Sequence, residues 1–259
     1  MYIDTHAHLY LSQFDEDIDQ VIQNALAQKV NKVFMPNVDL DTVNAMHRLA
    51  EIYPDICFPM MGLHPCSVGE AFESDLAQME DLFSQRSYIA VGEIGIDLYW
   101  DKTFFKQQVE AFKIQVEWAH KWSLPIVIHS RESIDEILAI LEEMNLPGLR
   151  GVFHCFTGNL EQSQRIIDLG FLMGIGGVVT FKNGGLDKVL PQIGLEWIIL
   201  ETDAPYLAPH PYRGKRNESA YIPIIADKLA ILYQVGSMDI AKKTTENALR
   251  LFAGVNQPK

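Results

Sequence analysis

Short apolar runs alternate along this chain with longer segments of helical periodicity, and this alternation constrains the fold more than any other feature. We identify eight such runs, rich in β-branched residues, as buried strands. They are Tyr2–His8, Lys32–Asn37, Ile56–Gly62, Ile89–Glu93, Pro125–His129, Gly151–His154, Phe171–Ile175 and Trp197–Asp203. Because strands that alternate with helices form parallel sheets with helical crossovers, the chain is predicted to be an α/β protein.

Two of the intervening segments show the helical pattern most clearly. One buried helix face is predicted from a stripe spaced four and three apart, made of Phe105, Val109, Phe112, Val116 and Ala119. After the fifth run, Ser133 and Glu136 have the spacing of a capping box, which predicts that a helix begins there. Its inward face is predicted to carry Ile134, Ile137, Leu138, Leu141 and Met144.

The number of repeats favours closure of the sheet. Eight strand–helix units in 259 residues match a single (β/α)8 TIM barrel, with residues 1–259 as one domain. An open, doubly wound sheet is the alternative fold. The tail after Ala253 is expected to be loosely ordered.

Composition narrows the classes of function. The net charge of −13 argues against a protein that coats nucleic acid nonspecifically, although it leaves nucleic acid open as a substrate. No apolar run is long enough to span a membrane, and the first residues lack the pattern of a signal peptide. Three cysteines without a CxxC pair predict neither a disulfide framework nor a zinc knuckle, so we expect a cytoplasmic protein.

The polar residues at the strand ends are the candidates for chemistry. His6 and His8, two apart in extended backbone, project to one side and can grip one metal ion, although a buried, hydrogen-bonded pair is an equal alternative for this motif alone. Glu93, His129, His154 and Asp203 end the fourth, fifth, sixth and eighth runs. Because the ends of parallel barrel strands share one face, the six side chains are predicted to form a metal site.

The ligand types are compatible with zinc, manganese, iron, nickel or magnesium and do not distinguish among them. Six ligands exceed the four of a closed structural zinc site, which favours two ions per chain with Glu93 between them. Such a centre activates water for hydrolysis, and Asp203 is placed to act as the general base.

Six different motifs occur one after another between Asp4 and Arg216. They are Asp4-Thr-His-Ala-His-Leu9, Gly62-Leu-His-Pro65, Gly92-Glu-Ile-Gly-Ile-Asp97, His129-Ser-Arg131, His154-Cys-Phe-Thr-Gly158 and Glu201-Thr-Asp-Ala-Pro205. As a set, together with Arg213-Gly-Lys-Arg-Asn217, they resemble the TatD-type family of metal-dependent deoxyribonucleases.

That resemblance implies an amidohydrolase-like barrel that uses divalent ions to remove nucleotides from DNA ends, as a 3'-5' exonuclease does. It implies the ligands His6, His8, Glu93, His129, His154 and Asp203, with Glu93 and Asp203 catalytic. The chain departs from the family pattern where Trp100 follows Tyr99 and where Ser219 stands in place of a usual proline. These departures bear on substrate contacts and leave the ligands untouched.

Further residues are candidates for substrate contact. Arg131 and the basic cluster of Arg213, Lys215 and Arg216 are suited to phosphate, and ion pairs or a solvated loop are the alternatives. His64 is interpreted as a binding residue rather than a ligand, and Tyr99 and Tyr206 as aromatic rings for stacking on bases. Glu201 shares strand parity with Asp203 and is predicted to orient a ligand histidine.

Other activities are less favoured by the sequence. The run Gly174–Gly177 is not GxGxxG, so no nucleotide cofactor is expected. The main alternative is an amidohydrolase-type enzyme that cleaves a small amide, lactone or ester, because activated water also attacks carbonyl carbon. A non-catalytic metal-binding scaffold is the third possibility.

Overall fold

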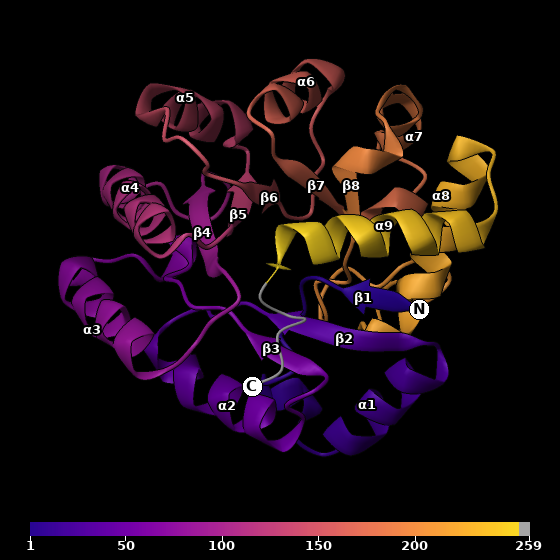
Figure 1. Ribbon diagram of the computed structural model, residues 1–259, viewed down its shortest axis with the longest axis horizontal. Helices are drawn as coiled ribbons and strands as arrows, with labels where there is room; N and C mark the ends of the chain where they lie inside the picture. Colours follow the sequence, from indigo (N-terminus) through magenta and orange to yellow (C-terminus); the bar gives the residue numbers. More distant parts are fainter. Residues whose placement is uncertain (254–259) are drawn as a thin grey trace.

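The computed structural model describes residues 1–253, and its strands and helices alternate as the sequence predicts (Figure 1). The eight strands, all paired in parallel, are β1 (Tyr2–Asp4), β2 (Val30–Met35), β3 (Cys57–Pro59), β4 (Val91–Asp97), β5 (Ile126–Arg131), β6 (Gly151–Phe153), β7 (Leu172–Ile175) and β8 (Ile198–Leu200). The prediction for the tail after Ala253 lies outside the described residues.

The strands form a closed barrel. Hydrogen-bonded ladders run in the order β1-β2-β3 and β4-β5-β6-β7-β8. Two isolated parallel bridges join these sheets, Met61 with Val91 between β3 and β4, and Ala7 with Ala204 between β1 and β8. The (β/α)8 barrel is therefore confirmed, and the doubly wound alternative is wrong.

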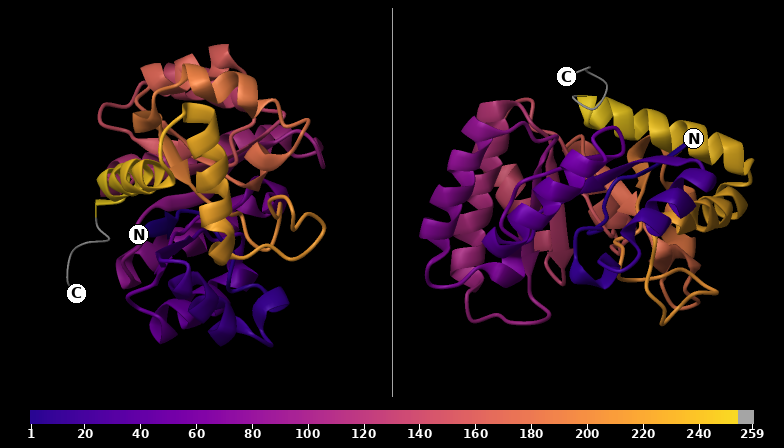
Figure 2. Two further views of the ribbon diagram at one scale, coloured as in Figure 1. Left: turned by 90° about the vertical axis from the view of Figure 1, so that its right-hand side faces the viewer. Right: turned by 90° about the horizontal axis from the view of Figure 1, so that it is seen from below.

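A helix follows each strand and packs on the outside of the barrel (Figures 1 and 2). These helices are α1 (Ile18–Ala27), α2 (Leu40–Ile52), α3 (Phe72–Gln85), α4 (Phe105–Trp122), α5 (Ile134–Met144), α6 (Leu160–Asp168), α7 (Leu186–Val189) and α8 (Ile222–Tyr233). Within residues 1–253, none of the helices has the length and apolar character needed to cross a membrane.

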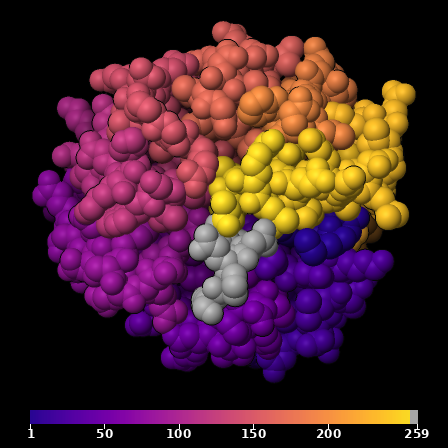
Figure 3. Space-filling model, viewed as in Figure 1, coloured from indigo at the N-terminus to yellow at the C-terminus, as the bar shows by residue number. Residues whose placement is uncertain are grey.

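A ninth helix, α9 (Ser237–Leu251), lies across the end of the barrel where the strands begin (Figure 1), and in the space-filling view from the same side its yellow atoms are on the surface (Figure 3). The Asn247 amide donates to the carbonyls of Leu195 at 2.7 Å and Ile198 at 2.8 Å, which fixes α9 to the start of β8. In the right panel of Figure 2, α9 lies at one end of the molecule and the loops that follow the strands lie at the other. The opposite end of the barrel is thus left for the site.

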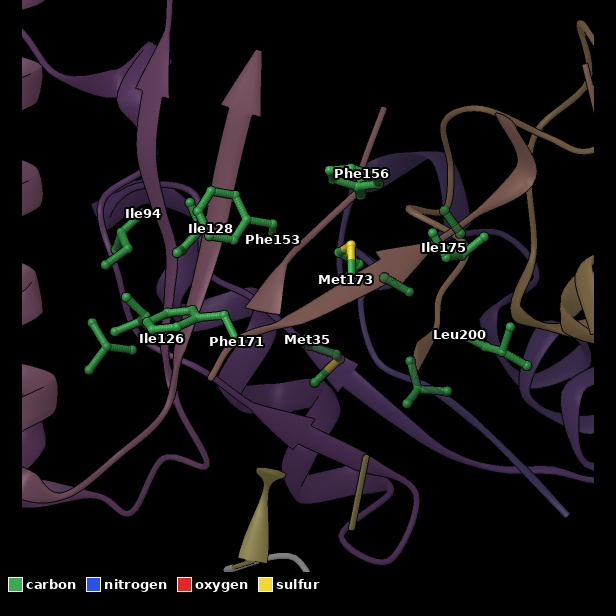
Figure 4. Close-up of a cluster of buried hydrophobic side chains, with 14 of the residues drawn as sticks. Met35, Ile94, Ile126, Ile128, Phe153, Phe156, Phe171, Met173, Ile175 and Leu200 are labelled. Carbon is green, nitrogen blue, oxygen red and sulfur yellow. The ribbon is translucent and has the colours of Figure 1, made fainter. Parts of the chain in front are cut away.

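The barrel interior is filled by one apolar side chain from each strand or from the residues beside it. This buried cluster consists of Ile3, Phe34, Met60, Ala90, Val127, Val152, Leu172 and Ile199. At the end where the strands begin, α9 and the residue after it add Ala248, Leu251 and Phe252 to the cluster. The other strand faces pack against the helices in a larger cluster, part of which Figure 4 shows, including Ile128, Phe153 and Met173.

Three local predictions from the sequence are corrected. The Ser133 hydroxyl donates to the carbonyl of Ile96 at 2.6 Å and makes no capping bond, so α5 begins at Ile134 without the predicted capping box. β1 ends at Asp4, so His6 and His8 follow the strand rather than lying in it. β4 continues past Glu93 to Asp97.

The extension of β4 depends on Gly95. This glycine has φ +149°, and a Cβ atom built on it would lie 2.0 Å from the carbonyl oxygen of His129. Gly95→Ala is therefore expected to lower the free energy of unfolding by roughly 2 kcal/mol or more, because strain and a backbone clash add. Chemical denaturation measures the loss. The matched control is Gly148→Ala, which also has positive φ but nothing within 4 Å, and an equal loss in the control would contradict the role of close packing.

Candidate metal centre

Strand parity brings several predicted residues to the inner face of the barrel at its open end. His129, His154 and Glu201 each lie two residues beyond an interior side chain, namely Val127, Val152 and Ile199. Because side chains alternate along a strand, the three point inward above that layer. These three residues therefore share the inner face of the barrel at its open end.

Glu93 lies at the centre of the histidines. Its carboxylate oxygens lie 3.1 Å from His6 Nε2, 3.0 Å from His154 Nε2 and 2.9 Å from His129 Nδ1. Glu93 is buried, with only 2% of its surface exposed. The register of β4 against β5 shifts between Val91 and Ile94, and an irregularity of this kind can re-aim the side chain that it contains.

His6, His8 and Asp203 form the second part of the cluster. His6 Nε2 and His8 Nε2 lie 3.3 Å apart, and Asp203 Oδ1 lies 3.7 and 3.6 Å from them. Three groups of potential ligand atoms result, which are His6/His8/Asp203, His6/Glu93/His154 and His64/Glu93/His129. All six predicted ligands therefore converge, and two of the groups share Glu93.

In His8 and in His129, one ring nitrogen makes a hydrogen bond to a residue beside the cluster, and the other ring nitrogen faces the cluster. The Tyr10 hydroxyl donates to the Pro36 carbonyl at 2.6 Å, so it accepts from His8 Nδ1 at 2.9 Å and His8 Nε2 keeps its lone pair. Asp97 Oδ2 accepts from His129 Nε2 at 2.9 Å, which leaves His129 Nδ1 facing Glu93. Metal-binding histidines require this tautomer arrangement, so the donor set fits bound cations.

His64 has the opposite arrangement. Its Nδ1 accepts the backbone N–H of Cys66 at 3.1 Å, so in the neutral ring Nε2 carries the proton. Nε2 lies 3.2 Å from His129 Nδ1 and 3.5 Å from Glu93 Oε1. His64 thus presents a donor at the edge of the cluster, which suits the binding role predicted from the sequence better than metal ligation.

Glu201 lies behind His154, with Oε1 3.3 Å from His154 Nδ1. The same oxygen accepts the backbone N–H of Cys155. A Cβ atom at Gly174 would lie 2.1 Å from Glu201 Oε2, so this glycine makes room for the carboxylate.

The electrostatics of the cluster match cation binding. Burial lowers the pKa of His6, which keeps its ring neutral. Burial alone would raise the pKa of Glu93, but His154, His6 and His64 hold it well below its ordinary value. Burial would lower the pKa of His154, but Glu93 and Glu201 raise it well above its ordinary value, so the site favours a positive charge there, whether proton or metal.

The segment after β8 carries Asp203 and is held by polar contacts. Asp203 has φ +58°, a left-handed conformation. The Asn217 amide donates to the carbonyls of Thr202 and Tyr206, both at 2.7 Å. Asp4 accepts from the hydroxyls of Thr202 and Ser219, both at 2.6 Å, so the serine that departs from the family pattern supports the segment.

A cleft of about 950 Å³ opens above the cluster, lined by Arg131, Arg213 and Lys215 among others. The guanidinium of Arg131 lies 3.9 Å from the centre of the Tyr99 ring, and that of Arg213 lies 4.1 Å from the centre of Phe181. Both arginines are thereby positioned by aromatic rings.

The structure separates the other predicted substrate residues. Arg216 pairs with Asp17 at 2.6 Å and Glu218 at 3.1 Å and is not part of the cleft lining, so its inclusion in a substrate-facing basic cluster is wrong. Tyr206 lines the cleft and is half exposed. Tyr99 is also half exposed, but Arg131 covers one face of its ring.

Sequence reasoning missed Tyr10 and Asp97 as partners of ligand histidines. Asp97 stood in a quoted motif, and its position four residues after Glu93 on one strand was the available signal. Tyr10 stands two residues after His8, but the acceptor that orients its hydroxyl, the Pro36 carbonyl, is distant in sequence.

Asp97→Asn is expected to reduce metal affinity or turnover by about 10- to 100-fold, because an amide cannot hold His129 in the required tautomer as a carboxylate does. Metal titration of the variant measures the loss. Asp101→Asn is the matched control, since Asp101 lies on the following loop and its carboxylate accepts only a local bond from Thr103. Equal metal affinities in Asp97→Asn and Asp101→Asn would contradict the role of Asp97 in positioning His129.

A (β/α)8 barrel with a histidine–carboxylate cluster at the ends of its strands is typical of metal-dependent barrel enzymes. The family model described as TatD related DNase matches residues 3–253, and the chain belongs to this family of metal-dependent hydrolases.

Similar proteins agree with this assignment. The metal-dependent hydrolase YabD of Bacillus subtilis is 38% identical over 97% of this chain and 99% of its own length. The 3'-5' ssDNA/RNA exonuclease TatD of Edwardsiella piscicida is 33% identical over 96% of this chain and 98% of its own. The crystal structure of YjjV, a TatD homologue from Escherichia coli, superposes with a TM-score of 0.92 at 30% identity, covering 99% of this chain and 98% of that one.

Proposed function

We propose that this protein removes nucleotides from the ends of single-stranded DNA by hydrolysing phosphodiester bonds in the 3'-5' direction, with two divalent ions per chain. The observation that carries the proposal is the position of Arg131, Arg213 and Lys215 around the cleft that holds the Glu93 cluster. Such a cationic rim in a chain of net charge −13 favours a substrate that carries phosphate. The exonuclease of Edwardsiella piscicida supports this substrate class.

Two sets of side chains would hold the ions. His6, His8 and Asp203, which form one group of neighbouring ligand atoms, would bind one ion. His129 and His154, which lie 2.9 and 3.0 Å from Glu93 Oε1, would bind the other, with Glu93 shared between the two sets. Divalent ions bound there supply Lewis acidity that polarises the phosphate and lowers the pKa of water.

The chain's own residues complete the chemistry. Asp203, whose pKa is lowered by His8, His154 and His6 although burial raises it, accepts the proton of the attacking water. His64 donates through Nε2 to a phosphate oxygen, and Arg131 and Arg213 bind the neighbouring phosphates. Tyr206 contacts the sugar or base, Tyr99 holds the guanidinium of Arg131 over its ring, and Glu201 orients His154.

The test is release of nucleotides from single-stranded DNA labelled at either end, with magnesium, manganese or zinc and an EDTA control. Metal-dependent shortening from the 3' end is the expected result. A panel of small esters, lactones and amides runs in parallel. Hydrolysis of one of these with no release from DNA would replace the nuclease by the amidohydrolase-type alternative, and inactivity on all of them would favour the non-catalytic scaffold.

A further inference from the structure

Trp100 is an exposed indole at the rim of the cleft. It is 69% exposed, whereas Trp118 is 4% exposed. Trp100 also lines the cleft, beside Asp97 and Arg131. Large aromatic side chains dominate core and interface energetics, so one that is left in water at the rim of a site marks a surface for a ligand.

The loop that carries Trp100 is fixed to the metal centre. Asp97 Oδ1 accepts the backbone N–H groups of Tyr99 at 2.9 Å and Trp100 at 3.0 Å, while its other oxygen accepts from His129. The Tyr99 and Trp100 rings meet edge to face with centres 4.9 Å apart. The guanidinium of Arg131 lies 5.2 Å from the Trp100 ring centre. One carboxylate thus positions both a ligand histidine and the indole.

These neighbours define what the surface can recognise. Arg131 supplies a planar cation for phosphate, and the indole beside it supplies a flat apolar face. A nucleotide carries both complementary parts, since every base has a π-face and every linkage a phosphate. Tyr99 is less suited to stacking because Arg131 covers one face of its ring.

We propose that Trp100 is a base-stacking residue that holds an unpaired base of the substrate while Arg131 binds the adjacent phosphate. This inference rests on the proposed function and deepens it. A base inside a duplex is already stacked on both faces and paired. The indole can therefore engage bases at single-stranded ends and not those within a duplex.

The test compares Trp100→Ala and Trp100→Phe in the metal-loaded enzyme acting on single-stranded oligonucleotides. Trp100→Ala is expected to raise KM about 10-fold with kcat within a factor of two, because stacking holds the ground state and the transition state alike, and phenylalanine should restore most of the loss. Met238→Ala is the control, since Met238 is 85% exposed on α9 and outside the cleft lining. An unchanged KM in Trp100→Ala would overturn the inference.

An abasic oligonucleotide separates stacking from support of Arg131. Wild-type protein and Trp100→Ala should bind the abasic oligonucleotide with the same affinity. If Trp100→Ala instead weakened the binding of abasic and base-bearing oligonucleotides equally, the stacking role would be overturned. Binding of phosphorothioate oligonucleotides, followed by fluorescence anisotropy, gives a readout without hydrolysis. If no nucleic acid is cleaved, the proposed function fails. Base-dependent binding that Trp100→Ala removes would then still support the inference, and its absence would overturn it.

Discussion

Glu93→Gln is expected to reduce kcat/KM by about 10³-fold or more, because the variant loses the one charge that faces both parts of the metal centre. The two carboxylate oxygens of Glu93 lie within 3.1 Å of ring nitrogens of His6, His129 and His154. Glutamine keeps the size of the side chain, so the loss should come from charge and ligation rather than from packing.

The measurement pairs steady-state kinetics with metal analysis of the same samples. Glu143→Gln is the matched control, because the Glu143 side chain is 73% exposed on α5. Thermal unfolding of both variants close to wild type would show that the fold is kept. Activity of Glu93→Gln within 10-fold of wild type would refute the central role of this carboxylate.

Asp203→Asn should reduce kcat by about 10³-fold, because the variant loses both a ligand and the proton acceptor. Asparagine is the informative substitution here. Asp203 has φ +58°, a conformation that asparagine tolerates well, whereas alanine would add backbone strain to the chemical loss.

Single-turnover kinetics separates the two roles of Asp203. If the proton acceptor is lost, the rate of Asp203→Asn should stay low at saturating metal, whereas loss of ligation alone would be rescued by added metal. Asp168→Asn at the end of α6 serves as control. Full rescue by metal would remove Asp203 from proton transfer and leave it as a ligand only.

The sequence was sufficient for the barrel and for the convergence of the six predicted ligands at one end of it. Strand parity explains the positions of His129 and His154, whereas His6, His8 and Asp203 lie beyond the ends of β1 and β8, and Glu93 lies at a register shift of β4. His129 and His154 lie two residues beyond interior positions, and that relation is visible in the alternation of apolar residues. The prediction also required that parallel strands end on one face, which the closed barrel satisfies.

The contacts that organise the ligands were not predictable in the same way. The Tyr10 hydroxyl is oriented toward His8 by the distant Pro36 carbonyl, and Ser133 bonds to Ile96 instead of its own helix. Arg216 and Arg131 are both basic residues in loops, yet one pairs with Asp17 and the other stacks on Tyr99. Such choices depend on which segments the fold brings together, and residue type alone leaves several partners possible.

The most direct test of a shared, two-ion centre is the number of metal equivalents bound at full activity. Stripped protein would be titrated with manganese or zinc, and bound metal and kcat measured at each step. Activity should reach its plateau at about two equivalents per chain, and Glu93→Gln should bind less. Full activity in protein that holds less than one equivalent would contradict the account.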